Sequence, residues 1–324
     1  GVQDVGVKLK DKYLALENRL GILAVSEGHK IFPNERSKIF INLSRWSPLF
    51  FILVTATPYE MIFNDGKTLY FNGDECTLFT QVDQMEDKQN NPNSPYKDFP
   101  EPRHFELNGL EQIKTQMLKD GSIETEEEAF AWRKLYYTQN DDGSLKYEAE
   151  IQDYYKRRYP DKTDKLNIDN CDLCDAAKDH GIIAIPPGTK DLPVSKLLPE
   201  LSRIIQKVVP HKVFNSVEHN NNDVNAAIEN GTPSLYFTCN KDLTGTNIPA
   251  WGHLEWCREL TNSIIFWIQA IGRPGRAFGN KENFGIFVSS MDGQIEHIVT
   301  AEFKIQGLRK QPKSIEQVIK SVYN

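Results

Sequence analysis

The chain has 324 residues, a net charge of −7 and a pI of about 5.6, and 39% of its residues are hydrophobic. Its length predicts roughly two domains, and its composition predicts a packed core. No apolar run is long enough for a membrane-spanning helix, and the first residues lack the apolar stretch of a secretory signal. The acidic balance excludes a uniformly basic nucleic-acid binder but leaves room for a local basic groove. Five cysteines, an odd number, favour a reducing compartment, so we expect an intracellular, cytoplasmic protein.

The first predicted elements are two short apolar runs, residues 21–26 and 49–56, which are typical of buried parallel strands. Residues 30–47 between them have helical spacing. A strand, a connection long enough for a helix and a second strand together predict a βαβ unit.

Residues 65–180 differ from this pattern because apolar residues become sparser and acidic residues accumulate. Helical spacing returns only at residues 122–157. We interpret the region as an insertion or linker with some helices, flanked by loops.

From residue 181 the alternation of strands and helices resumes. The pattern predicts strands at residues 182–185, 212–217, 234–238 and 283–288, and helices at residues 197–208, 223–229, 262–271 and 314–322. The predicted class is therefore α/β with parallel sheets, and the predicted domains are 1–64, 65–180 and 181–324.

Four polar segments follow predicted strands or helices, and each has an ordinary structural interpretation beside a functional one. In residues 269–276 a Pro-Gly turn separates Arg273 from Arg276, so both guanidinium groups could reach one polyanion. The alternative is a helix end capped by glycine. Residues 239–251 follow a strand and are either a turn-rich exit or a ligand-binding loop.

The other two segments follow the two N-terminal strands. Glu27 is placed where a carboxylate could orient water for attack on a phosphoryl group, or it lies in a solvent-facing turn. Thr55 and Thr57 lie where ligands bind in open α/β sheets, or they simply cap the strand before Pro58.

In this order and at these distances, the segments resemble motifs of superfamily 2 helicases and nucleic-acid translocases. Residues 26–29 (Ser-Glu-Gly-His) are similar to the Asp-Glu-x-His box, and residues 55–58 (Thr-Ala-Thr-Pro) to the third motif. Residues 245–249 (Gly-Thr-Asn-Ile-Pro) resemble the fifth motif, and residues 269–276 (Gln-Ala-Ile-Gly-Arg-Pro-Gly-Arg) the sixth. Residues 182–187 occupy the place of the strand in the fourth motif. The residues at the third motif (Thr-Ala-Thr-Pro-Tyr) and after the fifth (Pro-x-Trp) resemble those of restriction-enzyme and phage-type members.

The resemblance implies two RecA-like lobes that close on ATP and Mg²⁺ and move along nucleic acid, DNA more than RNA. It implies that Glu27 orients the attacking water and that Ser26 and His29 belong to the nucleotide site. Thr55 and Thr57 would couple nucleotide state to nucleic-acid contacts. Gly245, Thr246 and Asn247 would lie near ribose, metal or the nucleic-acid backbone. Arg273 and Arg276 would be the arginine fingers, with Gln269 at the phosphate.

The sequence departs from the family pattern at several positions. Ser26 replaces the Mg²⁺-associated Asp, Asn247 replaces the Asp of the fifth motif, and Ala270 replaces the first Arg of the sixth. No Gly-x-x-x-x-Gly-Lys-Ser/Thr phosphate loop is present, and residues 66–68 (Gly-Lys-Thr) lack its first glycine. We therefore expect either a fragment whose phosphate loop precedes residue 1, with an incomplete first lobe, or a degenerate non-catalytic nucleic-acid-binding or scaffold relative.

Two remaining features have weaker functional interpretations. Cys171 and Cys174 form half of a zinc-site pattern without a second pair, so we predict free thiols and no metal site. The basic residues 156–158 lie among Tyr154, Tyr155 and Tyr159 and could contact nucleic acid by stacking, but the acidic surroundings favour a solvated helix face. A nuclease role for residues 65–180 is a third and weaker hypothesis.

Overall fold

The structure, a computed structural model, describes residues 22–26, 50–54, 81–125, 130–160, 171–240, 242–243, 246–259, 264–289 and 314. The chain divides into two compact units. The first consists of residues 1–83 with 300–315, and the second of residues 84–299 with 316–324. None of the helices in the described part combines the length and the apolar character needed to cross a bilayer.

The described strands of the first unit are β1 (Ile22–Ser26) and β2 (Phe50–Val54), which run parallel. Both strands were predicted from their apolar runs. Ser26 lies opposite Val54 in the register, so both strands end at the same level. The helix predicted at residues 30–47 lies outside the described residues.

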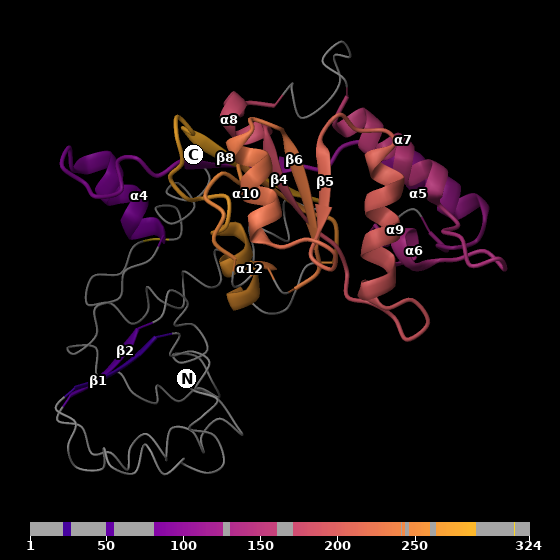
Figure 1. The fold of residues 1–324 in the computed structure, drawn as a ribbon, viewed down its shortest axis with the longest axis horizontal. Coiled ribbons are helices and arrows are strands. Elements are labelled where there is room, and N and C mark those ends of the chain that lie inside the picture. Colours follow the sequence, from indigo (N-terminus) through magenta and orange to yellow (C-terminus); the bar gives the residue numbers. More distant parts are fainter. Residues whose placement is uncertain are drawn as a thin grey trace. The chain divides into compact units, whose positions relative to one another are not determined.

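The second unit contains the remaining described elements (Figure 1). Its strands are β3 (Glu101–Glu106), β4 (His180–Ala184), β5 (Lys212–Asn215), β6 (Ser234–Thr238), β7 (His253–Trp256) and β8 (Asn283–Val288). Its helices are α5 (Leu110–Lys119), α6 (Trp132–Tyr137), α7 (Glu148–Arg158), α8 (Asp175–Lys178), α9 (Val194–Gln206), α10 (Asn221–Glu229) and α12 (Ile264–Ile271), while α4 (Gln81–Asn90) spans the boundary between the units.

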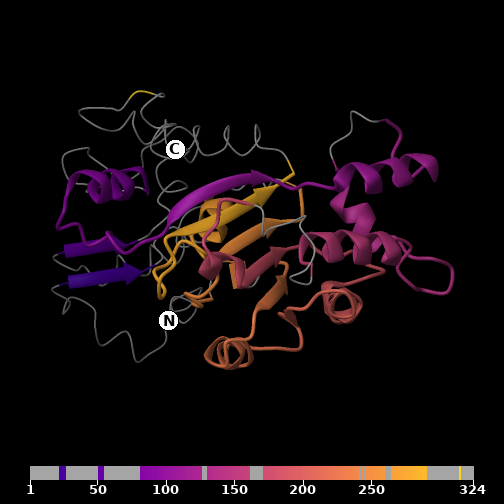
Figure 2. The same ribbon diagram turned by 90° about the horizontal axis from the view of Figure 1, so that it is seen from above.

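The six strands form one sheet in the order β3-β8-β7-β4-β6-β5, and every pairing is parallel (Figure 2). The predicted α/β class, with the parallel sheets expected of RecA-like lobes, is confirmed. The strands predicted near residues 182–185, 212–217, 234–238 and 283–288 all belong to this sheet. Of the closing helix predicted at residues 314–322, only Ser314 lies among the described residues.

Both faces of the sheet are covered, as its nearly continuous apolar strands require. The connection from β4 through α9 leads toward β5, whereas the connection from β7 through α12 leads toward β8, so the two helices cover opposite faces. On the α9 face, α6 and α7 add buried aromatic residues and α5 adds buried aliphatic ones, all in one cluster with Ile183, Leu235 and Phe287. On the α12 face, the rings of Trp256 and Trp267 meet edge to face at 4.7 Å.

Two strands of this sheet were not predicted. β3 is charged and contains Pro102, and β7 has the sequence His-Leu-Glu-Trp. Because β3 pairs with β8, and α5, α6 and α7 supply buried core residues, residues 101–159 are part of the same compact unit as the strands after residue 180. The boundaries predicted at residues 64 and 180 stay predictions.

Candidate functional site

The loop after β6 and the loop after α12 are joined by two arginines. Arg273 donates from Nε to the Leu243 carbonyl at 3.0 Å and from Nη1 to the Thr246 carbonyl at 2.8 Å. Arg276 donates from Nη1 to Asn247 Oδ1. The segments that resemble the fifth and sixth motifs therefore lie side by side, although the bonded residues are 27–30 positions apart in the sequence.

A buried carboxylate fixes the loop after β6. Asp242 is 7% exposed and accepts hydrogen bonds from the Thr246 hydroxyl at 2.8 Å and from the Tyr236 hydroxyl at 2.9 Å. Burial raises the pKa of Tyr236, as does the nearby Asp242 carboxylate, so this phenol keeps its proton and acts as a donor. Sequence analysis missed Asp242. Its signal was an acidic residue four positions after the last residue of β6, in a segment otherwise rich in neutral residues.

The two arginines differ in how tightly they are held. Arg273 is bound by the backbone carbonyls named above and also by the Gln269 carbonyl at 3.1 Å. Arg276 is half-buried, has a neutral hydrogen-bond partner in Asn247, and has no carboxylate partner within the described ranges. Burial lowers the pKa of Arg276, because the guanidinium loses water without gaining an anion. This geometry suits Arg276 to an external anion and Arg273 to loop positioning.

Lys281, just before β8, is a third cation in this region and is only 4% exposed. Its ammonium donates to the carbonyl oxygens of Pro249, Trp251 and Pro274 at 2.7–2.8 Å. Burial is the main cause that lowers its pKa to about 7; the charge of Arg276 acts in the same direction and Cys174 in the opposite one. Lysine is seldom buried without such partners. We name this arrangement the Lys281 clip.

The remaining predicted site residues are placed only in part. Ser26 is the last residue of β1, so Glu27 and Thr55 each directly follow one of two paired strands. Glu27, His29, Thr55, Thr57 and Gly245 themselves lie outside the described residues. The roles assigned to all of them stay predictions.

The basic cluster at the end of α7 is only in part the solvated helix face that was predicted, because Lys156 is exposed and Arg157 partly exposed but Arg158 is buried. Arg158 is 7% exposed, forms an ion pair with Glu255 of β7, and lies over the Phe287 ring at 4.2 Å. Tyr159 donates to Glu255 Oε1 at 2.7 Å and lies 2.9 Å from His253 Nε2. The tyrosines are buried because they anchor α7 to the sheet, so they are unavailable for stacking on bases. Lys156 alone of the three basic residues is exposed.

The two cysteines of the Cys-x-x-Cys segment, Cys171 and Cys174, are of intermediate exposure and form no disulfide with a described residue. Burial raises the pKa of Cys171, which makes its thiol less reactive. In the part of the chain that the structure describes, no group of three or more His, Cys, Asp or Glu side chains gathers to hold a metal ion.

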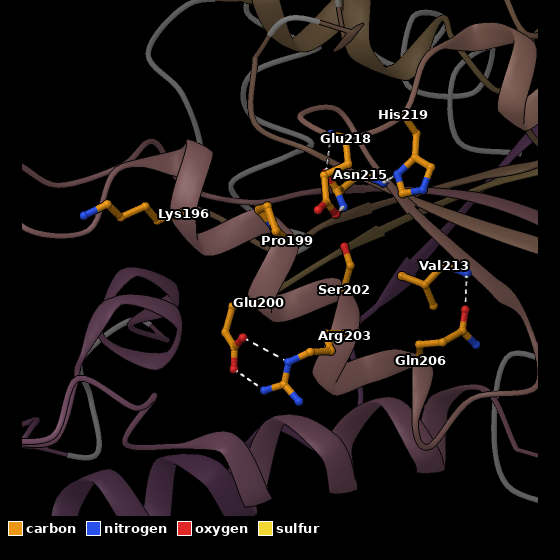
Figure 3. Close-up of a pocket in the computed structure, with 10 residues that line it drawn as sticks. All are labelled: Lys196, Pro199, Glu200, Ser202, Arg203, Gln206, Val213, Asn215, Glu218 and His219. Atoms are coloured by element: carbon orange, nitrogen blue, oxygen red, sulfur yellow. Dashed lines mark hydrogen bonds and ion pairs between the residues drawn. The ribbon is translucent and has the colours of Figure 1, made fainter.

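A concavity of about 470 Å³ lies along the outer edge of β5, beside α9 (Figure 3). The Gln206 Oε1 atom accepts from the Val213 N–H at 2.8 Å, and the Asn215 N–H donates to His219 Nδ1 at 3.3 Å. These side chains satisfy backbone donors on the open edge of the sheet, which protects the edge from pairing with other strands. No predicted site residue lines this concavity.

No protein-family model and no curated protein matches the sequence. Solved structures resemble it distantly. They include the ATP-dependent Type ISP restriction-modification enzyme LlaBIII bound to DNA, with a TM-score of 0.49 and 12% identity over 99% of this chain and 21% of that one. Mycobacterium smegmatis helicase Lhr bound to ssDNA and AMP-PNP gives 0.41 and 12%, over 94% and 33%. S. cerevisiae Dbp5 bound to RNA and ADP BeF3 gives 0.36 and 10%, over 93% and 63%. The chain thus spans about a fifth of the LlaBIII chain and a third of the Lhr chain.

Proposed function

We propose that this chain is part of an ATP-dependent nucleic-acid helicase or translocase of superfamily 2. One observation carries the proposal. The loops that resemble the fifth and sixth motifs are joined by Arg273 and Arg276, and the Arg276 guanidinium lacks a carboxylate partner in the described part of the chain. A half-buried, uncompensated guanidinium is suited to a phosphate, which it can bind through two parallel hydrogen bonds.

In this proposal Arg276 stabilises negative charge that develops on the transferred phosphoryl group of ATP. Arg273 holds the loop after β6 against the loop after α12, and Gln269 lies one helical turn earlier. Glu27 orients the attacking water. Thr55 and Thr57, after the paired strand β2, relay the nucleotide state to the bound strand.

The remaining residues bind rather than react. Ser26 and His29 belong to the nucleotide site of the first unit, and Gly245, Thr246 and Asn247 contact ribose or the nucleic-acid backbone. The Thr246 hydroxyl already donates to Asp242 and the Thr246 carbonyl already accepts from Arg273, so both groups hold the loop in place. The described residues gather no ligand set for Mg²⁺, and we derive no step through that ion. We propose a phosphate loop in a segment preceding residue 1, and an intracellular protein that acts on DNA rather than RNA.

The alternative is a non-catalytic nucleic-acid-binding or scaffold module. Ser26 favours it, because a hydroxyl replaces the carboxylate that the family pattern has at the end of this strand. The two proposals differ in whether ATP is hydrolysed, so turnover separates them.

The test is nucleic-acid-stimulated ATP turnover by the complete protein, including any segment that precedes residue 1. We expect turnover that single-stranded DNA stimulates and that the Glu27→Gln variant loses. Residues 1–324 alone should show no turnover above the Glu27→Gln control, because the phosphate loop is absent. Equal turnover by the complete protein and its Glu27→Gln variant would favour the scaffold alternative.

A further inference from the structure

The Lys281 clip joins two loops that the regular elements leave unconnected. Pro249 and Trp251 belong to the segment between β6 and β7, and Pro274 belongs to the turn after α12. Their three carbonyl oxygens lie outside helices and strands. They therefore do not accept the backbone hydrogen bonds that regular secondary structure provides. In its charged form the Lys281 amino group has three N–H donors, and three carbonyl oxygens lie 2.7–2.8 Å from its nitrogen.

The clip lies directly beside the contacts of the two arginines. Pro249 follows Asn247, the partner of Arg276, by two residues, and Pro274 lies between Arg273 and Arg276. Gly275 packs closely as well, since a Cβ atom there would lie 3.2 Å from the Phe284 ring. A shift of either carbonyl group would therefore move the backbone that carries Asn247 or Arg276.

We infer that Lys281 is a positioning residue, which fixes the loop at residues 246–252 against the turn at residues 272–276 and so sets the direction of the Arg276 guanidinium. This inference rests on the proposed function for its effect on catalysis, but the clip itself does not. It assigns a role to a residue outside every motif of the resemblance. This role explains why a lysine is buried here. One ammonium group can donate to all three carbonyl groups, whereas no neutral side chain of similar length could.

The first experiment measures hydrogen exchange of the 1–324 chain and needs no catalytic activity. Lys281→Met keeps the length and the apolar stem of the side chain but removes every donor. We expect faster amide exchange at residues 246–252 and 272–276 and unchanged exchange in β4 and β6. The control is Lys196→Met, which changes an exposed lysine on α9. Unchanged exchange at both loops would overturn the clip, whatever the protein does to ATP.

The second experiment measures steady-state ATP turnover by the complete protein. Lys281→Met should lower kcat by about 10- to 100-fold, as expected for a misplaced catalytic group, with less than about a 3-fold change in KM. Lys281→Arg, which keeps charged donors, should recover part of the loss. If Lys281→Met fails to fold, Lys281→Arg is compared with wild type in both experiments, and it should show smaller changes in the same direction.

A double variant separates positioning from general destabilisation. If Lys281 acts through Arg276, Lys281→Met should cost less than about 2-fold further once Arg276 is already alanine. An equal loss in both backgrounds would overturn the positioning role. A wild-type protein without ATP turnover would instead refute the proposed function, and hydrogen exchange would still decide the clip.

Discussion

Arg158 is buried and Arg276 is half-buried in the same unit, but only Arg158 has a carboxylate beside its charge among the described residues. Arg158 is bound to the Glu255 carboxylate, which is fully buried, and is covered by Phe287. Burial alone would lower the pKa of Arg158, yet the charge of Glu255 raises it above its ordinary value. Arg276 has only the neutral Asn247 side chain, and burial lowers its pKa.

This difference separates a structural cation from one suited to a ligand. Removing a partner from a buried ion pair leaves an uncompensated charge, so such a pair fixes the packing of its elements. A cation that lacks an anion can gain one from a substrate. The comparison predicts that substitutions at Arg158 change stability, whereas substitutions at Arg276 change turnover.

The largest expected effect is on catalysis. In the complete protein, Arg276→Ala should reduce ATP turnover by about 10³-fold or more, because loss of an arginine finger removes charge stabilisation in the transition state. Nucleotide binding should change less. The matched control is Arg157→Ala, since Arg157 pairs with Asp153 on the surface of α7. Full turnover by Arg276→Ala would remove the finger role.

The next largest effect is on stability. Arg158→Met should destabilise the second unit by about 3–5 kcal/mol, because it leaves Glu255 buried without its cation. The measurement is urea unfolding followed by tryptophan fluorescence, which reports this unit through the buried Trp132, Trp256 and Trp267. Replacing both partners, as in Arg158→Met with Glu255→Gln, should recover much of the loss. A loss below about 1 kcal/mol in the single variant would contradict the assigned role.

The same buried network predicts sensitivity to acid. His253 is fully buried, donates from Nδ1 to the Ala177 carbonyl at 2.8 Å, and fits beside Gly181, where any Cβ atom would lie 2.1 Å from His253 Nε2. Burial lowers the pKa of His253 from 6.5 to about 3. Between these values the unfolded chain binds the extra proton, so stability falls as the pH falls.

The expected loss between pH 7 and pH 3 is roughly 3–5 kcal/mol from this residue. His253→Gln removes the titration while keeping a polar side chain, so unfolding at several pH values should show a difference between the variant and wild type that shrinks toward pH 3. The carboxyl groups titrate equally in both proteins. A difference in unfolding free energy that stays constant with pH would therefore show that groups other than His253 cause the acid sensitivity.

The contrast also explains how far the sequence could predict this molecule. Strands β4, β6 and β8 were predicted because a strand covered on both faces needs an apolar run. Such a run can be recognised in the sequence without knowing which elements pack on the strand. β7 was missed because its His253 and Glu255 are buried only by virtue of Tyr159 and Arg158, which come from a helix about 95 residues earlier. For the same reason the prediction of a solvated helix face at residues 156–158 is wrong at Arg158.

The sequence named several residues of the candidate site, whose roles stay predictions, but not the contacts between them. Arg273, Arg276, Thr246 and Asn247 were identified from order and spacing, and the structure brings their two loops together. Asp242 and Lys281 were not identified, because their importance comes from partners that are distant in sequence or belong to the backbone. Every residue has a backbone carbonyl group, so the sequence does not show which carbonyl oxygens Lys281 binds.

The smallest expected effect tests whether the neutral partner of Arg276 matters. Asn247→Ala removes one side-chain hydrogen bond, which contributes about 1 kcal/mol, so turnover of the complete protein should fall about 5-fold. Stability should change by less than about 0.5 kcal/mol, because Asn247 is exposed and Arg276 can turn toward water. Turnover and urea unfolding measured on the same preparation separate the two quantities. If Asn247→Ala lost stability without losing turnover, the Arg276–Asn247 contact would be a structural one, like that of Arg158 with Glu255, and the distinction between the two arginines would fail.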